Sequence, residues 1–279
     1  MKKTDSVDIY ESLLTTTYRR DIWSKLLKAI HDYKLIEDGD VICVCISGGK
    51  DSMLLAKCFM CLKKFMDFNF EVKYLVMNPG YNKENLNKIK ENLKKLNIPA
   101  VIEKTDIFEI ANMQEKGSCF LCAKMRRGAL YNLAKAMGCN KIALGHHYDD
   151  VIETTLMNIL SSGSFQTMLP KLQSTNFPGM ELIRPLYYVR EKDIIRFAKN
   201  NDLDFIRCAC RFTEESEKDE SNSRRLLIKK LIKDLKKDIP QIEENLFVAP
   251  NNVTLDMILG YKKGGVHHFY LDEYEKKEN

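Results

Sequence analysis

The sequence predicts an α/β protein whose central parallel sheet is flanked by helices, and three observations support this prediction. Residues 41–46 form an unbroken apolar run rich in β-branched residues, which is typical of a strand buried on both faces. A glycine turn and a helical pattern follow that run directly. Further strand and helix patterns then alternate along the chain, as expected for βαβ units in a doubly wound sheet.

The composition indicates a soluble globular protein. The 279 residues are 44% hydrophobic and 30% charged, and 44 Lys and Arg against 39 Asp and Glu give a net charge of +5. This excess permits nucleic-acid binding without demonstrating it. No apolar run approaches the roughly 20 residues that span a bilayer, and residues 1–8 lead into no signal-peptide core. We therefore expect a cytoplasmic protein without membrane contact, in which the nine cysteines serve metal, redox or sulfur chemistry rather than disulfides.

Each expected element follows from its local pattern. Alternating or continuous apolar runs predict strands, and apolar residues at helical spacing predict helices. In chain order we expect a helix near 22–33, strands at 41–46, 70–77, 100–104 and 141–145, helices at 53–59, 85–96 and 151–160, a short extended segment at 182–186, and helices from 190 and at 224–237. We divide the chain into an N-terminal arm and helix (1–37), a nucleotide-binding and cysteine-containing domain (38–212) and a C-terminal helical extension (213–279).

The turn after the first strand has a recognisable motif, Ser47-Gly48-Gly49-Lys50-Asp51-Ser52. Glycines permit unusual dihedral angles and let an anion approach the backbone, and Asp51 and Ser52 suit the cap of the following helix. A strand–loop–helix unit of this kind directs N–H groups and the positive helix end at one point, which favours a phosphate. The motif is neither G-x-x-x-x-G-K-[ST] nor G-x-G-x-x-G. It resembles the signature of the PP-loop pyrophosphatases, which split ATP between its α and β phosphates.

Two further strands are expected to end near this loop. The strand at 70–77 ends at Met77, and the strand at 141–145 ends in Gly145-His146-His147-Tyr148-Asp149-Asp150. Because the carboxyl ends of parallel strands line the ligand crevice, Met77, Gly145 and His146 are expected beside the nucleotide. Asp51 and Asp150 are candidate Mg²⁺ ligands, since Mg²⁺ prefers carboxylate and phosphate oxygens. The histidines either orient substrate or nucleotide, or are rim histidines bonded to loop backbone.

Two cysteine groups stand apart from the rest. Cys119 and Cys122 lie three residues apart at the expected start of a helix, so they share a face where the helix dipole favours thiolates. C-x-x-C alone fits a zinc half-site, a redox pair or a cluster half-site. Cys208-Ala209-Cys210 supplies more sulfur, and the sequence does not show whether the two groups converge. The remaining five are expected in the core: Cys43, Cys45, Cys58, Cys61 and Cys139.

Taken together, these motifs resemble the tRNA 2-thiocytidine synthetases, the TtcA-type PP-loop sulfurtransferases. The resemblance runs from about Asp38 to Arg225. Its matches are Ser47 to Ser52, Pro79-Gly80-Tyr81, Cys119-x-x-Cys122 with Arg126-Arg127-Gly128, Gly145-His146-His147-x-Asp149-Asp150, Arg184-Pro185-Leu186, Glu191-Lys192-Asp193-Ile194 and Cys208. It implies a Rossmann-like fold of the adenine nucleotide alpha hydrolase type, ATP as substrate, and a [4Fe–4S] cluster held by three cysteines.

Carried over residue by residue, the resemblance makes Cys119, Cys122 and Cys208 the cluster ligands. The family usually has C-x-x-C at the second group, so the role of Cys210 here stays open. The implied reaction adenylates the C2 oxygen of a cytidine, at tRNA position 32, and replaces it with sulfur. Ser47, Gly48, Gly49 and Ser52 would hold the phosphates while Lys50 neutralises charge and Asp51 and Asp150 hold Mg²⁺. The implied partners are tRNA, a cysteine-desulfurase-type sulfur donor and a second copy in a homodimer. Candidates for contacts with tRNA phosphates are Arg126, Arg127, Arg224 and the lysines from Lys229 to Lys237. A solvated helix face explains the lysines equally well.

Three alternatives remain open from the sequence. A lysidine-synthetase-like ligase would use the same loop to join an amine to an adenylated base, leaving the cysteines idle. A zinc enzyme would bind the metal through Cys119, Cys122, Cys208 and Cys210 and carry sulfur as a persulfide. A module that binds nucleotide or tRNA without turnover would release no pyrophosphate in response to tRNA.

Overall fold

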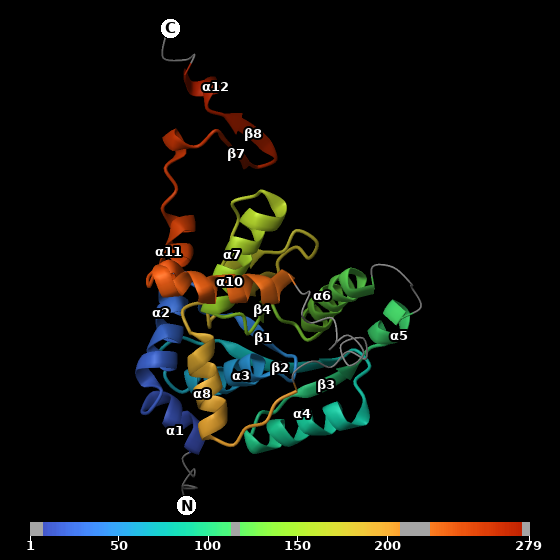
Figure 1. Ribbon diagram of the computed structural model, residues 1–279. Helices are drawn as coiled ribbons and strands as arrows, with labels where there is room; N and C mark the ends of the chain where they lie inside the picture. Colours follow the sequence, from blue (N-terminus) through green and yellow to red (C-terminus); the bar gives the residue numbers. More distant parts are fainter. Residues whose placement is uncertain (1–7, 113–117, 207–223, 275–279) are drawn as a thin grey trace, which may run out of the picture.

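The computed structural model describes residues 8–112, 118–206 and 224–274 (Figure 1). Its main sheet has six strands in the order β3-β2-β1-β4-β6-β5, and only the edge strand β5 runs antiparallel to its neighbour. The strands are β1 (Val41–Ile46), β2 (Glu71–Asn78), β3 (Val101–Lys104), β4 (Lys141–Ala143), β5 (Lys171–Gln173) and β6 (Glu181–Ile183). This mostly parallel sheet confirms the predicted fold class.

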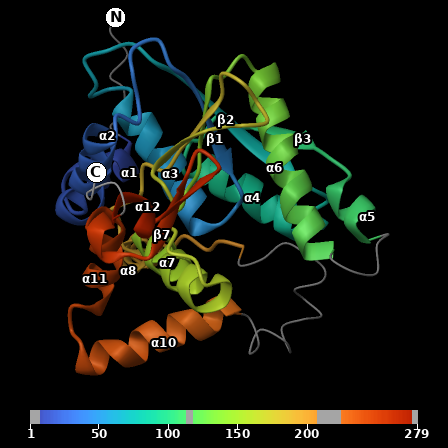
Figure 2. The ribbon, with the colours of Figure 1, turned by 90° about the horizontal axis from the view of Figure 1, so that it is seen from above.

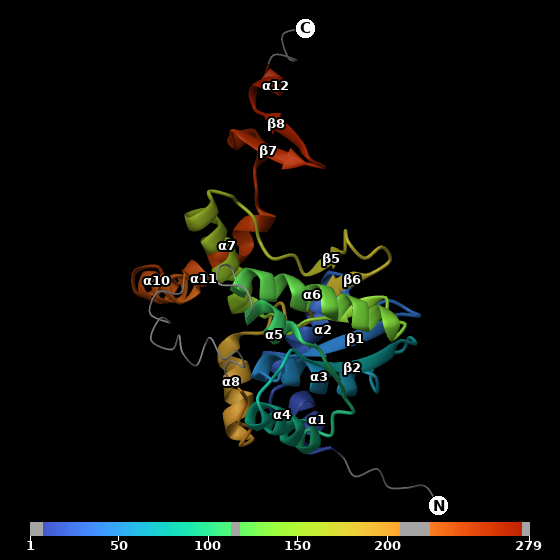
Figure 3. The ribbon, with the colours of Figure 1, turned by 90° about the vertical axis from the view of Figure 1, so that its right-hand side faces the viewer.

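Helices cover both faces of the sheet. Figure 3 shows α6 on one face and α3 and α4 on the other. The helices around the sheet are α1 (Ile9–Thr15), the π-helix η1 (Arg19–Trp23), α2 (Ser24–Asp32), α3 (Lys50–Leu62), α4 (Lys83–Lys95), α5 (Ile107–Asn112), α6 (Ser118–Ala136), α7 (Tyr148–Ser162) and α8 (Glu191–Asn200). Figure 2 shows the same arrangement from above, with α10 (Arg224–Asp238) beside α7.

The alternation of side chains along β1 divides the core in two. Ile42, Val44 and Ile46 are buried in the larger hydrophobic cluster, which includes residues of α3 and α4. Cys43 and Cys45 face the opposite way and pack in a smaller cluster with residues of α6. Successive residues of a strand point to opposite faces, so one short segment serves both layers. All five cysteines expected in the core are buried.

The strand order locates the ligand crevice. From β1 the chain moves outward through β2 to β3, then returns to place β4 on the other side of β1. In open α/β sheets ligands bind where the order reverses, at the carboxyl ends of the two strands. Here those ends lead into residues 47–52 after β1 and residues 144–150 after β4.

Beyond the sheet, the C-terminal part contains more than helices. Helices α10 and α11 (Ile242–Val248) pack on α7. The short 3₁₀ turns η4 (Ala249–Asn251) and η5 (Leu255–Met257) lead to the projecting hairpin of β7 (Gly260–Lys263) and β8 (Val266–Phe269), followed by α12 (Leu271–Tyr274) (Figure 1). The expectation of a helical extension omitted this hairpin. Within the described ranges, no helix is both long and apolar enough to cross a membrane.

Candidate functional site

The turn between β1 and α3 is built by its small residues. Gly48 has a φ of +87°, and a Cβ there would lie 2.7 Å from side-chain atoms of Ile89 and Ile206. The Ser52 hydroxyl accepts from the Ser47 N–H at 3.1 Å and donates to the Gly49 carbonyl at 3.0 Å. The turn is thereby closed on itself, with Gly49 as the N-cap of α3 and the positive end of that helix beside it.

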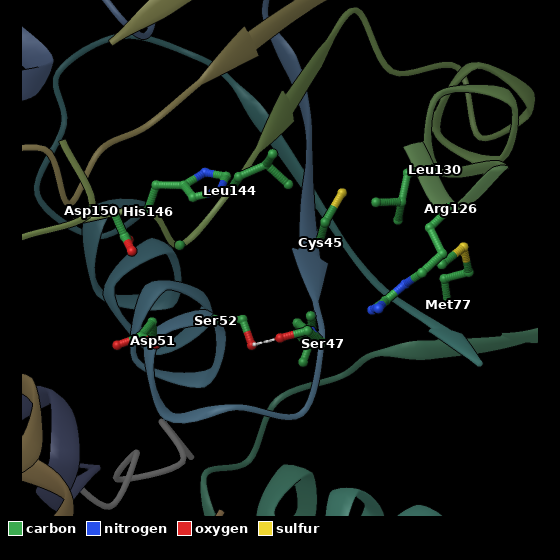
Figure 4. Close-up of a pocket in the computed structure, with 12 residues that line it drawn as sticks. Cys45, Ser47, Asp51, Ser52, Met77, Arg126, Leu130, Leu144, His146 and Asp150 are labelled. Atoms are coloured by element: carbon green, nitrogen blue, oxygen red, sulfur yellow. Dashed lines mark hydrogen bonds between the residues drawn. The ribbon is translucent and has the colours of Figure 1, made fainter. Parts of the chain in front are cut away.

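A cavity of about 290 Å³ opens beside this turn at the switch point of the sheet. That volume is close to the lower end of ligand pockets, about 300 Å³. Figure 4 shows residues from both strand-to-helix junctions around it. Seven residues predicted to form the site line the cavity: Ser47, Asp51, Ser52, Met77, Gly145, His146 and Asp150. Of the other predicted residues, Gly48 and Gly49 lie in the turn itself and Lys50 is the first residue of α3.

Five other lining residues were not predicted for this site: Cys45, Ile46, Arg126, Leu130 and Leu144. Figure 4 shows the Arg126 side chain reaching from α6 into the cavity beside Met77. Its contact with tRNA stays a prediction. Cys45 follows from the strand period, because it faces α6 at the end of β1. No sequence signal indicated which residues of α6 face the cavity.

Gly145 allows the two junctions to approach closely. A Cβ at this position would lie 2.9 Å from the Asp51 carbonyl carbon and 2.9 Å from the Ser52 backbone nitrogen. Both neighbours are backbone atoms in the first turn of α3, so they cannot move aside as a flexible side chain would. A glycine after β4 is therefore required for this junction to touch the first turn of α3.

Asp51 and Lys50 differ in how their surroundings affect their charged forms. Burial raises the pKa of Asp51, although His147 and Lys50 act in the opposite direction. Its Oδ1 is the one buried side-chain oxygen or nitrogen without a hydrogen-bond partner among the described residues, and it lies 3.7 Å from His147 Nε2. Lys50 Nζ lies 3.2 Å from Asp51 Oδ2 and 3.1 Å from Glu191 Oε1. Burial lowers the pKa of Lys50, but the two carboxylates outweigh it and raise the pKa overall.

At the second junction, the carboxylates are paired. His147 Nδ1 accepts from the Asp150 N–H at 3.4 Å, and Asp150 Oδ2 accepts from the His147 N–H at 2.9 Å, which together cap α7. Asp150 Oδ1 accepts from the Arg225 guanidinium of α10. Asp149 accepts from two nitrogens of Arg190 at 3.3 and 3.1 Å.

His146 is a neutral hydrogen-bonding group in this cavity. Its burial, together with the charge of Arg184, lowers its pKa to about 4. Its Nδ1 accepts from Arg184 Nε at 3.4 Å. The ring proton of the neutral form is therefore on Nε2, and His146 can donate a hydrogen bond at neutral pH.

The predicted metal-binding cysteines are only partly within the described chain. Cys119 and Cys122 lie in the first two turns of α6, seven and four residues before Arg126, respectively. Cys208 and Cys210 lie outside the described residues. No cluster of three or more metal-ligating side chains occurs in the described parts of the chain. The proposed ligand set therefore stays a prediction.

Comparison with known proteins identifies the family. The model of the PP-loop domain matches residues 19–235. A tRNA-cytidine(32) 2-sulfurtransferase from Geotalea uraniireducens is 38% identical over 236 residues, covering 83% of this chain and 91% of that protein. The chain belongs to the tRNA-cytidine(32) 2-sulfurtransferase family of PP-loop enzymes. A second member, from Syntrophotalea carbinolica, is 38% identical over 229 residues, covering 81% of this chain and 86% of its own.

Solved structures support the fold assigned to this sulfurtransferase family member. The U34-tRNA thiolase NcsA from Methanococcus maripaludis, solved with its [4Fe–4S] cluster, aligns with a TM-score of 0.65 at 20% identity. The alignment covers 86% of this chain and 80% of NcsA. This alignment confirms the predicted fold, and the domain match together with the two relatives confirms the predicted family.

Proposed function

We propose that this protein is an ATP-dependent tRNA sulfurtransferase that replaces the C2 oxygen of a tRNA cytidine, at position 32, with sulfur. One observation carries the proposal: the Ser47–Ser52 loop and helix α6 line the same cavity. Arg126 lines it from α6, one helical turn after Cys122. This arrangement supports a site shared by the nucleotide-binding motif and the first cysteine pair.

The segment before Cys208 also approaches this loop. A Cβ on Gly48 would lie 2.7 Å from Ile206 Cδ1, so Ile206 packs against the glycine turn. Cys208 follows two positions later in the sequence. Two residues of chain span at most about 7 Å, which supports Cys208 as the third ligand beside Cys119 and Cys122. Cysteine thiolates are the usual ligands of iron–sulfur clusters.

The proposed chemistry begins with a poor leaving group, the C2 oxygen of cytidine. Lys50 neutralises charge on the departing pyrophosphate as that oxygen attacks the α-phosphorus of ATP, and AMP then becomes the leaving group. The unpartnered Asp51 Oδ1 offers a buried carboxylate oxygen to Mg²⁺. His146 donates from Nε2 to a polar group in the cavity. A [4Fe–4S] cluster on the three cysteines would supply the iron that carries the sulfur.

The names of the relatives favour sulfur insertion over a lysidine-synthetase-like ligation. ATP and tRNA are the proposed substrates. A cysteine-desulfurase-type donor and a homodimer remain proposals that follow from the family, as do the cytoplasmic location and the three-part division of the chain.

The test compares two cysteines in the full-length protein purified without oxygen. We expect a brown wild type that forms 2-thiocytidine in tRNA when ATP and sulfide are supplied. Cys119→Ala should lose both the iron and the product, whereas Cys61→Ala removes a buried core thiol and should keep both. Iron and activity retained in Cys119→Ala would contradict the ligand set. Zinc in place of iron in the active wild type would favour the persulfide route.

A further inference from the structure

One carboxylate connects two lysines from different parts of the chain. Glu191 Oε1 lies 3.1 Å from Nζ of Lys50, the lysine of the nucleotide loop. Glu191 Oε2 accepts from Nζ of Lys229 on α10. The side chain of Glu191 is 20% exposed and that of Lys50 27% exposed, so both are partly shielded from water. A partly buried charge pair is screened less by salt than an exposed one.

The backbone around Glu191 holds this carboxylate in place. Glu191 is the first residue of α8, where the helix dipole favours a negative charge. Its N–H donates to Asp149 Oδ2 at 2.6 Å, and Asp149 is held in turn by Arg190. Burial raises the pKa of Glu191, but Lys229 and Lys50 outweigh burial and lower the pKa to about 2. The Glu191 carboxylate is therefore ionised at neutral pH, and each of its two oxygens is held by a lysine.

Helix α10 is tied to the site at a second point. Arg225 lies one helical turn before Lys229 and so on the same face of α10. Its guanidinium contacts Asp150, and its Nε lies 2.9 Å from Glu153 Oε2. The face of α10 that carries these two cations thus contacts the second junction directly through Asp150, and the first indirectly through Glu191 and Lys50.

We propose that Glu191 is a positioning residue that holds Lys50 at the loop and couples nucleotide binding there to helix α10 through Lys229. The phosphates of a nucleotide compete with Glu191 for the single charge of Lys50. When Lys50 binds the phosphates instead, Glu191 interacts with Lys229 alone. This ion pair then becomes stronger and holds α10 more tightly. Coupling of this kind is reciprocal, so the position of α10 also sets the affinity of the loop. The inference rests on the proposed function only in requiring a nucleotide at this loop.

Hydrogen exchange measures this coupling directly. Full-length protein is exchanged with and without a non-hydrolysable ATP analogue and Mg²⁺, and peptides from 224–238 are followed. We expect the analogue to slow exchange in wild-type α10 about fivefold or more, the lower bound of typical coupling energies. Glu191→Gln and Lys229→Gln should each reduce that ratio to near one.

The matched control is Lys233→Gln, which removes one positive charge from an exposed position of the same helix. It should keep the wild-type ratio. If Glu191→Gln or Lys229→Gln only destabilises the protein, exchange in α10 is faster both with and without the analogue, and the ratio of the two rates stays at the wild-type value. That outcome overturns the coupling. Calorimetry on the same samples reports binding of the analogue. A wild type that fails to bind overturns the proposed function and this inference together, whereas binding without slower exchange in α10 overturns this inference alone.

Discussion

The two strand-to-helix junctions that line the cavity differ in how their charges are satisfied. After β1, Asp51 keeps one buried carboxylate oxygen without a hydrogen-bond partner. After β4, Asp149 is paired with Arg190, and Asp150 is paired with Arg225 and with its own helix cap. An uncompensated buried oxygen is costly, so it points to a ligand that the free protein lacks. At the second junction, by contrast, the carboxylates already have partners within the protein.

The largest expected effect on activity comes from changing Asp51, the carboxylate of the first junction. Asp51→Asn should reduce tRNA-dependent pyrophosphate release about 1,000-fold, because it removes the open oxygen that would hold Mg²⁺. Asp150→Asn should cost less, since both oxygens of Asp150 already have partners. A larger loss in Asp150→Asn than in Asp51→Asn would reverse the roles assigned to the two junctions.

Lys50→Met tests the role of the positive charge at the first junction. Removing a group that neutralises charge on the departing pyrophosphate should lower kcat about 100-fold. Lys63→Met changes an exposed lysine just past the end of α3 and should leave kcat unchanged. Pyrophosphate release at saturating ATP measures both variants. An equal kcat in Lys50→Met and wild type would remove Lys50 from the reaction.

Gly145→Ala tests the contact between the two junctions. The added Cβ would meet backbone atoms of α3 at 2.9 Å, and overpacking of this kind costs about 1–3 kcal/mol. Gly128→Ala is the control: it lies inside α6 with open space around it and should stabilise the protein by about 0.5–1 kcal/mol. Urea denaturation of both variants gives the two free energies of unfolding. A Gly145→Ala variant with the wild-type free energy of unfolding would mean that the two junctions can separate without loss of stability.

The smallest expected effect concerns pH. Because burial raises the pKa of Asp51 above its ordinary value of 3.8, the folded state binds this proton more tightly than the unfolded state. The resulting stabilisation is complete below pH 3.8 and is lost as pH rises through the higher folded-state pKa. Asp51→Asn should therefore have a slightly higher Tm than wild type at pH 7, with the difference shrinking toward pH 4. A variant less stable than wild type at pH 7 would contradict this charge balance.

Local patterns in the sequence predicted the first junction well. The apolar run of β1, the glycines and Ser52 determine the turn through contacts within six residues, so sequence order alone specifies them. The α/β class followed from the alternation of strand and helix patterns along the chain. The family resemblance added the chemistry, which no periodicity contains.

Contacts between distant segments were beyond that reasoning. Arg225 reaches Asp150 across 75 positions, and Ile206 packs on Gly48, yet neither pair carries a local signal. Helix α10 illustrates the limit. Leu226 and Leu227 are apolar residues of this helix, yet they are 48% and 65% exposed. Ile228 and Ile232 are buried instead, one turn apart on the side that packs on α7. The apolar residues of α10 extend around too much of the helix for periodicity to select the buried face.

The central claim, that ATP adenylates the C2 oxygen of cytidine at this cavity, has one direct measurement. A tRNA carrying ¹⁸O at C2 of the target cytidine is incubated anaerobically with the reconstituted protein, ATP and sulfide, and the AMP formed is analysed by mass spectrometry. The account predicts that the label leaves with AMP, one ¹⁸O for each 2-thiocytidine made. Thiolated tRNA accompanied by unlabelled AMP would contradict it.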